Sequence, residues 1–207
     1  MTRVAAIDCG TNSIRLLVAD GHIGEDGRPH LADLTRQMRI VRLGQGVDAR
    51  GYLDPAAISR AVEATVEYQR MIEKLGATSI RFVATSATRD ASNSAEFVRQ
   101  IKAVIGVEPE VVVGTQEASL SFRGAVGGLG ESLPGPMLVV DIGGGSTELV
   151  LGSTSVKQAV SIDMGAVRVT EKFFAHVDPA GGVPAADQER AIAWIDEQLD
   201  IAEKSVD

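Results

Sequence analysis

The chain has a single cysteine, few aromatic residues and no long apolar run, and each shortage excludes a class of protein. One cysteine among 207 residues, Cys9, excludes an intramolecular disulfide framework and fits a reducing cytoplasm. No apolar run reaches the roughly 18 residues of a membrane-spanning helix, and the N-terminus lacks the pattern of a signal peptide. Aromatic residues make up 4% and hydrophobic residues 44% of the chain, so we expect an aliphatic core that includes Cys9.

Histidines and basic residues are also sparse or scattered. His22, His30 and His176 do not have the spacing of a zinc site. The net charge is −8, of which −6 lies in residues 171–207, and no basic stripe of the kind that binds duplex nucleic acid is present. We therefore expect a cytoplasmic protein that binds neither duplex nucleic acid nor a membrane.

The most informative stretch covers residues 137–151, MLVVDIGGGSTELVL. It reads as a strand, a turn of three glycines and a second strand. Glycine lets the backbone adopt positive φ and approach a ligand closely, and successive N–H groups in such a turn form an anion-binding concavity. Asp141 and Glu148 flank the turn with the hard oxygen ligands that hold Mg²⁺ beside a phosphate. The stretch predicts a phosphate-and-metal site, although an ordinary glycine-rich turn with two solvated acids would contain the same residues.

The opening of the chain repeats this stretch about 133 residues earlier. Four positions align: Asp8 with Asp141, Gly10 with Gly143, Ser13 with Ser146 and Leu16 with Leu149. An internal repeat of this kind predicts two structural copies. We expect two hairpins whose turns face each other and hold a phosphate chain from both sides.

Between and after the two copies, strand and helix patterns alternate. Further strands are expected at 34–43, 79–85, 110–113 and 155–162, and helices at 55–75, 93–105, 116–126, 167–174 and 185–204. Asp54 and Pro55 predict the start of the first helix and Gly76 its end. Residues 86–93 read as a polar loop, with Asn93 and Glu96 forming a capping box for the next helix. The last helix has one apolar stripe, formed by Ile192, Ile195, Leu199 and Ala202.

This alternation predicts an α/β protein with mixed sheets. We expect a first domain at 1–127 and a second at 134–207, with the glycines of 124–130 in a linker between them. The second copy is much shorter than the first, so we expect its domain to be incomplete and to leave a sheet edge uncovered. Such an edge favours instability or a homodimer.

Several segments together resemble the exopolyphosphatase/guanosine pentaphosphate phosphohydrolase family of the actin-like ATPase superfamily. They are AAIDCGTNSIRLLVAD (5–20), FVATSATRDASN (82–93), GTQEASLSFRGA (114–125), VVDIGGGSTELVLG (139–152) and DMGAVRVTEKF (163–173). The resemblance implies two actin-like, ribonuclease-H-like domains with mixed five-stranded sheets and an active site between them. It also implies that the second domain is only partly present.

The resemblance implies a role for Glu117, which alone would be an ordinary acid in the first turn of a helix. It corresponds to the second acid of the family's GxEEA motif, the general base that activates water. The first acid of the motif is replaced by Gln116. A carboxylate beside phosphate oxygens would have a raised pKa, which suits a base working near neutral pH.

The resemblance also implies the remaining ligands. The phosphate-binding residues would be Thr11, Asn12, Ser13, Arg89, Gly143, Gly144, Gly145 and Ser146, and the metal ligands Asp141, Glu148 and Asp8. Alone, Asp8 could equally be a turn-capping aspartate and Arg89 a solvated loop arginine. Arg168 is a weaker candidate than Arg89.

The reaction implied is hydrolysis of a phosphoanhydride with Mg²⁺ or another divalent cation. The substrate would be polyphosphate, cleaved at its ends to orthophosphate, or alternatively guanosine pentaphosphate. A truncated, non-catalytic module that binds polyphosphate or nucleotide stays open as a second class of function. An actin-like ATPase or sugar kinase is disfavoured by the context of Glu117 and by the DIGGGSTE run.

Overall fold

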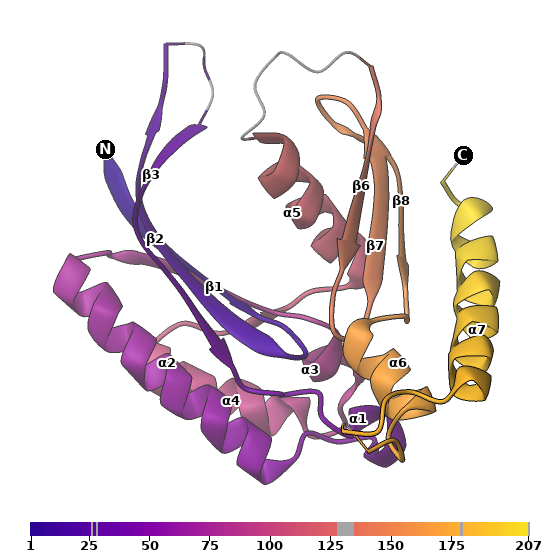
Figure 1. Cartoon of the computed structure of the whole chain (residues 1–207). Coiled ribbons are helices and arrows are strands. Elements are labelled where there is room, and N and C mark those ends of the chain that lie inside the picture. The colour runs from indigo at the N-terminus through magenta and orange to yellow at the C-terminus, as the bar shows by residue number, and fades with distance from the viewer. Residues whose placement is uncertain (26, 28, 128–134, 179, 207) are drawn as a thin grey trace. The chain divides into compact units, whose positions relative to one another are not determined.

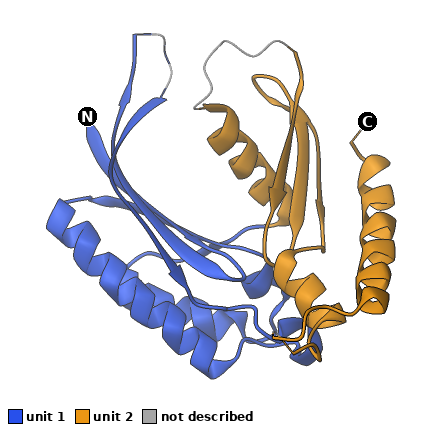
Figure 2. Cartoon of the chain, viewed as in Figure 1, with its two compact units in different colours: residues 1–112 blue, residues 113–207 orange. Residues whose placement is uncertain are grey.

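The chain forms two compact units, residues 1–112 and 113–207, in the computed structural model (Figures 1 and 2). The structure describes residues 1–25, 27, 29–127, 135–178 and 180–206. Each unit has its own sheet and its own buried apolar clusters. Of the predicted linker at 124–130, residues 124–127 form the end of a helix, and residues 128–130 lie outside the described residues.

The first unit contains a five-stranded mixed sheet in the order β3-β2-β1-β4-β5. Its strands are β1 (Thr2–Cys9), β2 (Ser13–Ile23), β3 (Pro29–Ile40), β4 (Ser79–Ala84) and β5 (Glu110–Val111). The first three are antiparallel neighbours, whereas β4 runs parallel to β1 and β5 parallel to β4. The predicted mixed five-stranded sheet is therefore confirmed for this unit.

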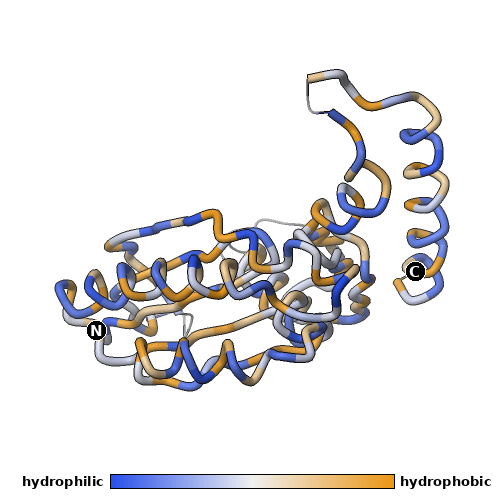
Figure 3. Tube along the Cα trace, turned by 90° about the horizontal axis from the view of Figure 1, so that it is seen from below, coloured by the Kyte–Doolittle hydropathy of each residue, from blue (hydrophilic) through white to orange (hydrophobic). Residues whose placement is uncertain are grey.

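Four helices accompany this sheet, and polar and apolar residues alternate along the turns of the helical trace (Figure 3). They are α1 (Val47–Arg50), α2 (Pro55–Leu75), α3 (Ser86–Asp90) and α4 (Ser94–Ile105). The predicted ends of α2 are confirmed. The Asp54 carboxylate accepts a hydrogen bond from the Ala56 N–H (2.8 Å), and Gly76 ends the helix with φ of 73°.

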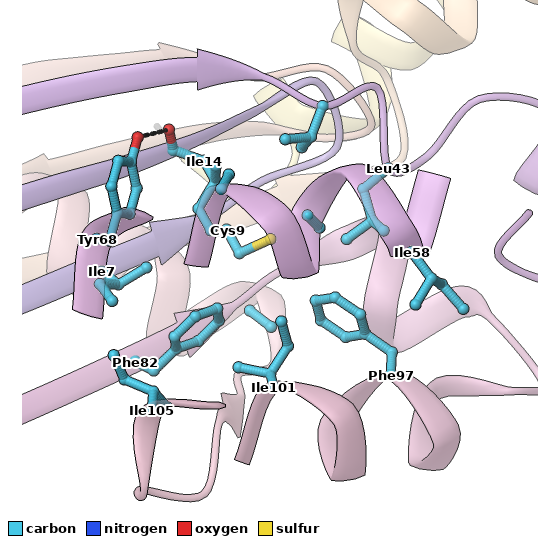
Figure 4. Packing of buried hydrophobic residues seen from close by; sticks show 14 of the residues in the cluster. Ile7, Cys9, Ile14, Leu43, Ile58, Tyr68, Phe82, Phe97, Ile101 and Ile105 are labelled. Carbon is cyan, nitrogen blue, oxygen red and sulfur yellow. Dashed lines mark hydrogen bonds between the residues drawn. The ribbon is translucent and has the colours of Figure 1, made fainter. Parts of the chain in front are cut away.

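The core of the first unit lies between the sheet and helices α2 and α4 (Figure 4). Phe97 and Ile101 of α4 are 0% exposed, and the Tyr68 hydroxyl of α2 donates to the Ile14 carbonyl at 2.9 Å. Cys9 is buried in this cluster, which confirms the expected packing role, and burial raises the pKa of its thiol. The thiol is therefore not a nucleophile at neutral pH.

Two local predictions for this unit are wrong. Residues 86–90 form helix α3 rather than a polar loop. Asn93 makes no side-chain cap on α4, because its amide instead pairs with the Leu53 N–H (2.8 Å) and carbonyl (3.0 Å). In addition, β3 covers residues 29–40 rather than the predicted 34–43. Its pairing with β2 extends from Ile40, opposite Ser13, back to Pro29, opposite Ile23.

The second unit contains a three-stranded antiparallel sheet in the order β6-β7-β8. Its elements are α5 (Gly114–Gly127), β6 (Met137–Ile142), β7 (Thr147–Gly152), β8 (Val156–Ile162), α6 (Ala166–Phe173) and α7 (Ala185–Glu203). The expected second five-stranded sheet is thus represented by three strands.

Helices α5 and α7 are associated with different faces of this sheet. Ala118 and Phe122 of α5 pack with Val150, so α5 lies in the second unit although the predicted first domain extends to residue 127. Helix α7 packs through Ala202, Trp194 and Ile195 in a cluster with Leu149, Val160 and Ile162. The predicted stripe of α7 is only partly buried, because Ile192 is 56% and Leu199 41% exposed.

In the part of the chain that the structure describes, no helix combines the length and the apolar character needed to cross a bilayer.

Candidate functional site: two glycine turns and an acidic sheet face

The two predicted hairpins share their strand register and their turn hydrogen bond. In the turn between β1 and β2, the Gly10 N–H donates to the Ser13 carbonyl at 3.0 Å. In the turn between β6 and β7, the Gly143 N–H donates to the Ser146 carbonyl at 2.9 Å. The register places Asp8 opposite Arg15 and Asp141 opposite Glu148. The internal repeat read from the sequence is therefore a repeat of backbone geometry.

In the second turn, three carbonyl groups are held by the first turn of α6. The hydrogen bonds are Ala166 N–H to Gly143 (2.9 Å), Val167 N–H to Gly144 (2.9 Å) and Arg168 Nε to Gly145 (2.9 Å). In a planar trans peptide the N–H points away from the C=O. The N–H groups of Gly144, Gly145 and Ser146 are thus directed away from α6. Successive N–H groups turned to one side are what an anion-binding nest requires.

The carbonyl groups of the first turn are likewise held by hydrogen bonds, which come from the segment that follows β3. The Thr11 carbonyl accepts from the Gly44 N–H (2.8 Å), and the Asn12 carbonyl accepts from the N–H groups of residues 41 and 42 (3.0 and 2.9 Å). The N–H groups of Asn12 and Ser13 consequently point away from that segment. The Thr11 hydroxyl is buried and shares a hydrogen bond of 2.8 Å with the Ser86 hydroxyl, so part of its bonding capacity is used inside the fold.

The glycines in and beside the second turn allow backbone segments to pack closely, and they do not adopt left-handed backbone conformations. Among the described residues, Gly143, Gly144 and Gly145 do not have positive φ, so that part of the prediction is wrong. A Cβ on Gly165, which precedes α6, would lie 2.4 Å from the carbonyl carbon and oxygen of Gly144. A Cβ on Gly143 would lie 3.0 Å from the Ser146 carbonyl oxygen. The turn and the start of α6 are packed backbone to backbone, which only glycine at position 165 permits.

Asp141 and Glu148 lie directly opposite each other on neighbouring strands, so their side chains share one face of the second sheet. Glu148 is 1% exposed and accepts a hydrogen bond from the Ser161 hydroxyl at 2.7 Å. Asp141 is exposed and accepts from the Ser121 hydroxyl of α5 at 2.6 Å. Two carboxylates directly opposite each other destabilise a sheet, and a bound cation would remove that cost.

This donor set fits a divalent cation that keeps other oxygen ligands. Mg²⁺ is commonly bound through one or two carboxylates plus water and phosphate oxygens. Within residues 1–206 apart from the undescribed positions, no group of three or more His, Cys, Asp and Glu side chains is arranged to hold a metal. Asp8, the third predicted ligand, belongs to the first unit and lies 3.9 Å from the Arg15 guanidinium. Its role as a ligand stays a prediction.

Glu117 lies in the first turn of α5 and is partly buried. That turn packs against the acidic face, because a Cβ on Gly114 would lie 2.5 Å from the Cβ of Ser161, the residue that donates to Glu148. Gln116, which stands where the resembling family has its first acid, accepts from the Val113 N–H at 3.2 Å. This is half of a capping box, which gives Gln116 a structural role at the helix start. The base role of Glu117 stays a prediction.

The two candidate arginines make different contacts within the protein. Arg89 is partly buried in α3, donates to the Val112 carbonyl at 3.2 Å and lies 3.6 Å from the Asp90 carboxylate. Arg168, predicted as the weaker candidate, holds the Gly145 carbonyl of the second turn directly. Ser121 and Ser161 were not predicted at all. The sequence signal for Ser161 was a hydroxyl between Val160 and Ile162 in an otherwise apolar strand end. The structure places it opposite Glu148.

The fold and the turns agree with comparisons to known proteins. Residues 22–206 match the family model described as "Ppx/GppA phosphatase family", and the chain belongs to this family. It is 51% identical over 184 residues to "Exopolyphosphatase 2" of Mycobacterium tuberculosis, a match covering 86% of this chain and 57% of that protein.

Solved structures show the same similarity. A crystal structure of an exopolyphosphatase-like protein has a TM-score of 0.89 and 43% identity, covering 100% of this chain and 62% of that one. The Ppx/GppA family member of Aquifex aeolicus has a TM-score of 0.73 and 32% identity, covering 97% and 62%. The mixed α/β fold is therefore that of the actin-like Ppx/GppA structures. The chain spans about 57–62% of the length of these relatives.

Proposed function

We propose that the chain belongs to a phosphoanhydride hydrolase that binds the end of a polyphosphate chain and releases orthophosphate. The observation that carries the proposal is the second glycine turn. Its carbonyls are tied to α6 and to Arg168, and its N–H groups point to the other side, in the hairpin that also carries Asp141 and Glu148. The exopolyphosphatase relative supports polyphosphate as the substrate class.

The phosphate oxygens would be bound by backbone N–H groups and by a cation. Gly143, Gly144, Gly145 and Ser146 form one nest, and Thr11, Asn12 and Ser13 form its repeat in the first unit. Arg89 would add a charged donor. Asp141 and Glu148 would hold Mg²⁺ or another divalent cation, with Asp8 as a further ligand. Such an ion neutralises phosphate charge and stabilises the leaving group.

Glu117 would act as the general base. Its carboxylate takes a proton from water while the water oxygen forms a bond to the terminal phosphorus. The bridging P–O bond breaks, and its electron pair stays on the shortened chain. The nest N–H groups stabilise the charge on the equatorial oxygens. No covalent intermediate is required.

A polyphosphate- or nucleotide-binding module without turnover is the alternative from a different class of function. Guanosine pentaphosphate is the alternative substrate within the same chemistry. Orthophosphate release from each of the two substrates, measured with and without Mg²⁺ beside calorimetric binding, separates these functions. Binding without release would establish the module, and release only from the nucleotide would replace polyphosphate as substrate.

The substitution Glu117→Gln tests the base. We expect the rate of phosphate release to fall about 10²–10⁴-fold, the usual contribution of a general base, with polyphosphate affinity retained. Glu63→Gln is a matched control, because Glu63 is an exposed acid on α2 in the first unit. An undiminished rate in Glu117→Gln would refute the assignment.

A further inference from the structure

The end of the β2–β3 hairpin brings together two histidines whose spacing in the sequence does not mark them as a metal site. His22 of β2 lies directly opposite His30 of β3 in the strand register. Their rings are stacked, with centroids 5.4 Å apart and an interplanar angle of 21°. Both residues are exposed. Two imidazole rings therefore lie side by side where an ion from solvent can reach them.

This end of the hairpin is a ribbon of only two strands (Figure 1). Strand β1 begins at Thr2, which lies opposite Gly21, so its pairing with β2 reaches no further than that residue. Beyond Gly21, the described residues of β2 pair only with β3. An isolated two-stranded hairpin is at best marginally stable in water. A ligand that links the two strands would therefore stabilise this end of the hairpin.

The separation of the two rings fits a shared transition-metal ion. Zn–N bonds of about 2.0–2.1 Å in a tetrahedral site place the centroids of two imidazole rings about 5 Å apart. The χ2 torsion of histidine has a broad minimum, so a rotation of an exposed ring can turn one nitrogen toward the ion. A histidine that binds a metal commonly donates its other ring N–H to a hydrogen bond. Metal binding by one nitrogen is thus compatible with a hydrogen bond at the other.

The chemistry of the donors selects the class of cation. Imidazole nitrogen suits Zn²⁺, Ni²⁺ and Cu²⁺, whereas Mg²⁺ prefers oxygen ligands. The nearest acid on the same face of β2, Asp20, is held by the Arg3 guanidinium through hydrogen bonds of 2.7 and 2.8 Å. Among the described residues, no third His, Cys, Asp or Glu side chain joins the two histidines. Water would therefore complete the coordination of a bound ion.

We propose that His22 and His30 form a binding site for a divalent transition-metal ion, such as Zn²⁺, which links strands β2 and β3. The ion closes the loop between the two histidines and holds the ribbon in register. The site differs in its ligands from the pair formed by Asp141 and Glu148, which offers only carboxylate oxygen. It lies outside the residues assigned to phosphate hydrolysis, so the proposal is independent of the proposed function.

The test is calorimetric titration of the chain, prepared without a polyhistidine tag, with Zn²⁺ in the presence of excess Mg²⁺. We expect Zn²⁺ to bind despite the Mg²⁺ and to slow hydrogen exchange at the amides of residues 21–23 and 30–31. His22→Phe and His30→Phe keep an aromatic ring for stacking but remove both ring nitrogens. Each should lower the affinity for Zn²⁺ about tenfold or more, because even the loss of an outer-shell partner of a metal site commonly costs that much.

His176→Phe is the matched control, because the third histidine lies in the second unit, where its Nε2 shares a hydrogen bond of 3.0 Å with Asp187. It should leave both the affinity for Zn²⁺ and the exchange of the hairpin amides unchanged. Three results would overturn the proposal: no Zn²⁺ binding in excess Mg²⁺, unchanged affinity in His22→Phe and His30→Phe, or an equal loss in His176→Phe. Circular dichroism checks that each variant is folded, and orthophosphate release with Mg²⁺ alone should be the same in both hairpin variants as in the unaltered chain.

Discussion

The two glycine hairpins of this chain share their backbone geometry but differ in the residue that lies opposite the acid. In both, the turn glycine donates to a serine carbonyl, and the acid lies two residues before the glycine. The residue opposite that acid differs: Arg15 faces Asp8, whereas Glu148 faces Asp141. The Arg15 guanidinium lies 3.9 Å from the Asp8 carboxylate, whereas Asp141 faces a second carboxylate across the strands. The difference teaches that the repeat keeps the backbone geometry of the turn while the charge beside the acid changes at one cross-strand position.

The turns also differ in how they are held. The first is tied to an irregular segment after β3 and the second to the start of a helix. A Cβ on Gly44, in the first anchor, would lie 2.3 Å from the Thr11 side chain, whereas a Cβ on Gly165, in the second, would lie 2.4 Å from the Gly144 backbone. A side chain can move aside more easily than backbone. Perturbing the second turn should therefore have larger effects than perturbing the first.

The largest effect is expected for Gly165→Ala. The added Cβ would lie 2.4 Å from the Gly144 backbone, so turn and helix must separate. We expect a loss of about 1–3 kcal/mol in the free energy of unfolding, the usual cost of overpacking. Weaker polyphosphate binding should accompany it. Urea unfolding and calorimetry measure the two effects.

Gly124→Ala is the control for that substitution, because nothing outside the adjoining backbone of α5 lies within 4 Å of its Cβ position. It should leave stability unchanged or raise it by about 0.5–1 kcal/mol, as for glycine to alanine in a helix. A Gly165→Ala variant as stable as Gly124→Ala would mean that the second turn is not held more tightly than the first.

A smaller effect is expected on the affinity for Mg²⁺, which substitution of Glu148 should lower more than substitution of Asp8. Glu148→Gln keeps an acceptor for Ser161 but removes one carboxylate, so we expect affinity for Mg²⁺ to fall about 10-fold or more. Asp8→Asn should change it less, since Arg15 lies beside Asp8. Titration of Mg²⁺ against the melting temperature measures both. Equal losses would show that the two hairpins contribute alike to the cation site.

The smallest effect concerns acid sensitivity of the first unit. The hydrogen bond from Arg81 lowers the pKa of Glu110 below its usual value. The unfolded chain binds the proton more readily, so the stabilisation is present above the ordinary Glu pKa of about 4.3 and is lost as pH falls toward the lowered value. Glu110→Gln should therefore flatten the decline of stability below about pH 4.3. Urea unfolding at several pH values tests this, and an unchanged slope would contradict it.

Much of the local structure was predictable, and the failures share one cause. The hairpins, helix α2 and its ends follow from short-range glycine, proline and capping signals. Helix α3 and the Asn93 pairing with Leu53 did not. Ser86 of α3 shares a hydrogen bond with Thr11, and Asn93 bonds Leu53, so both involve partners distant in sequence. The reason for the glycines was also misjudged. It is the approach of Gly165 to Gly144, a contact between residues about twenty positions apart.

By itself, the sequence determined that the chain repeats an acid–glycine–serine hairpin within an α/β pattern. These features need only strand alternation and turn hydrogen bonds, which act over a few residues. Tertiary structure alone decided that the carbonyls of both turns are tied back, that Ser121 and Ser161 hold the two acids, and that Leu138, Val140 and Ile142 are exposed. An apolar strand looks the same in sequence whether or not another element covers it. Its burial is a property of what packs against it.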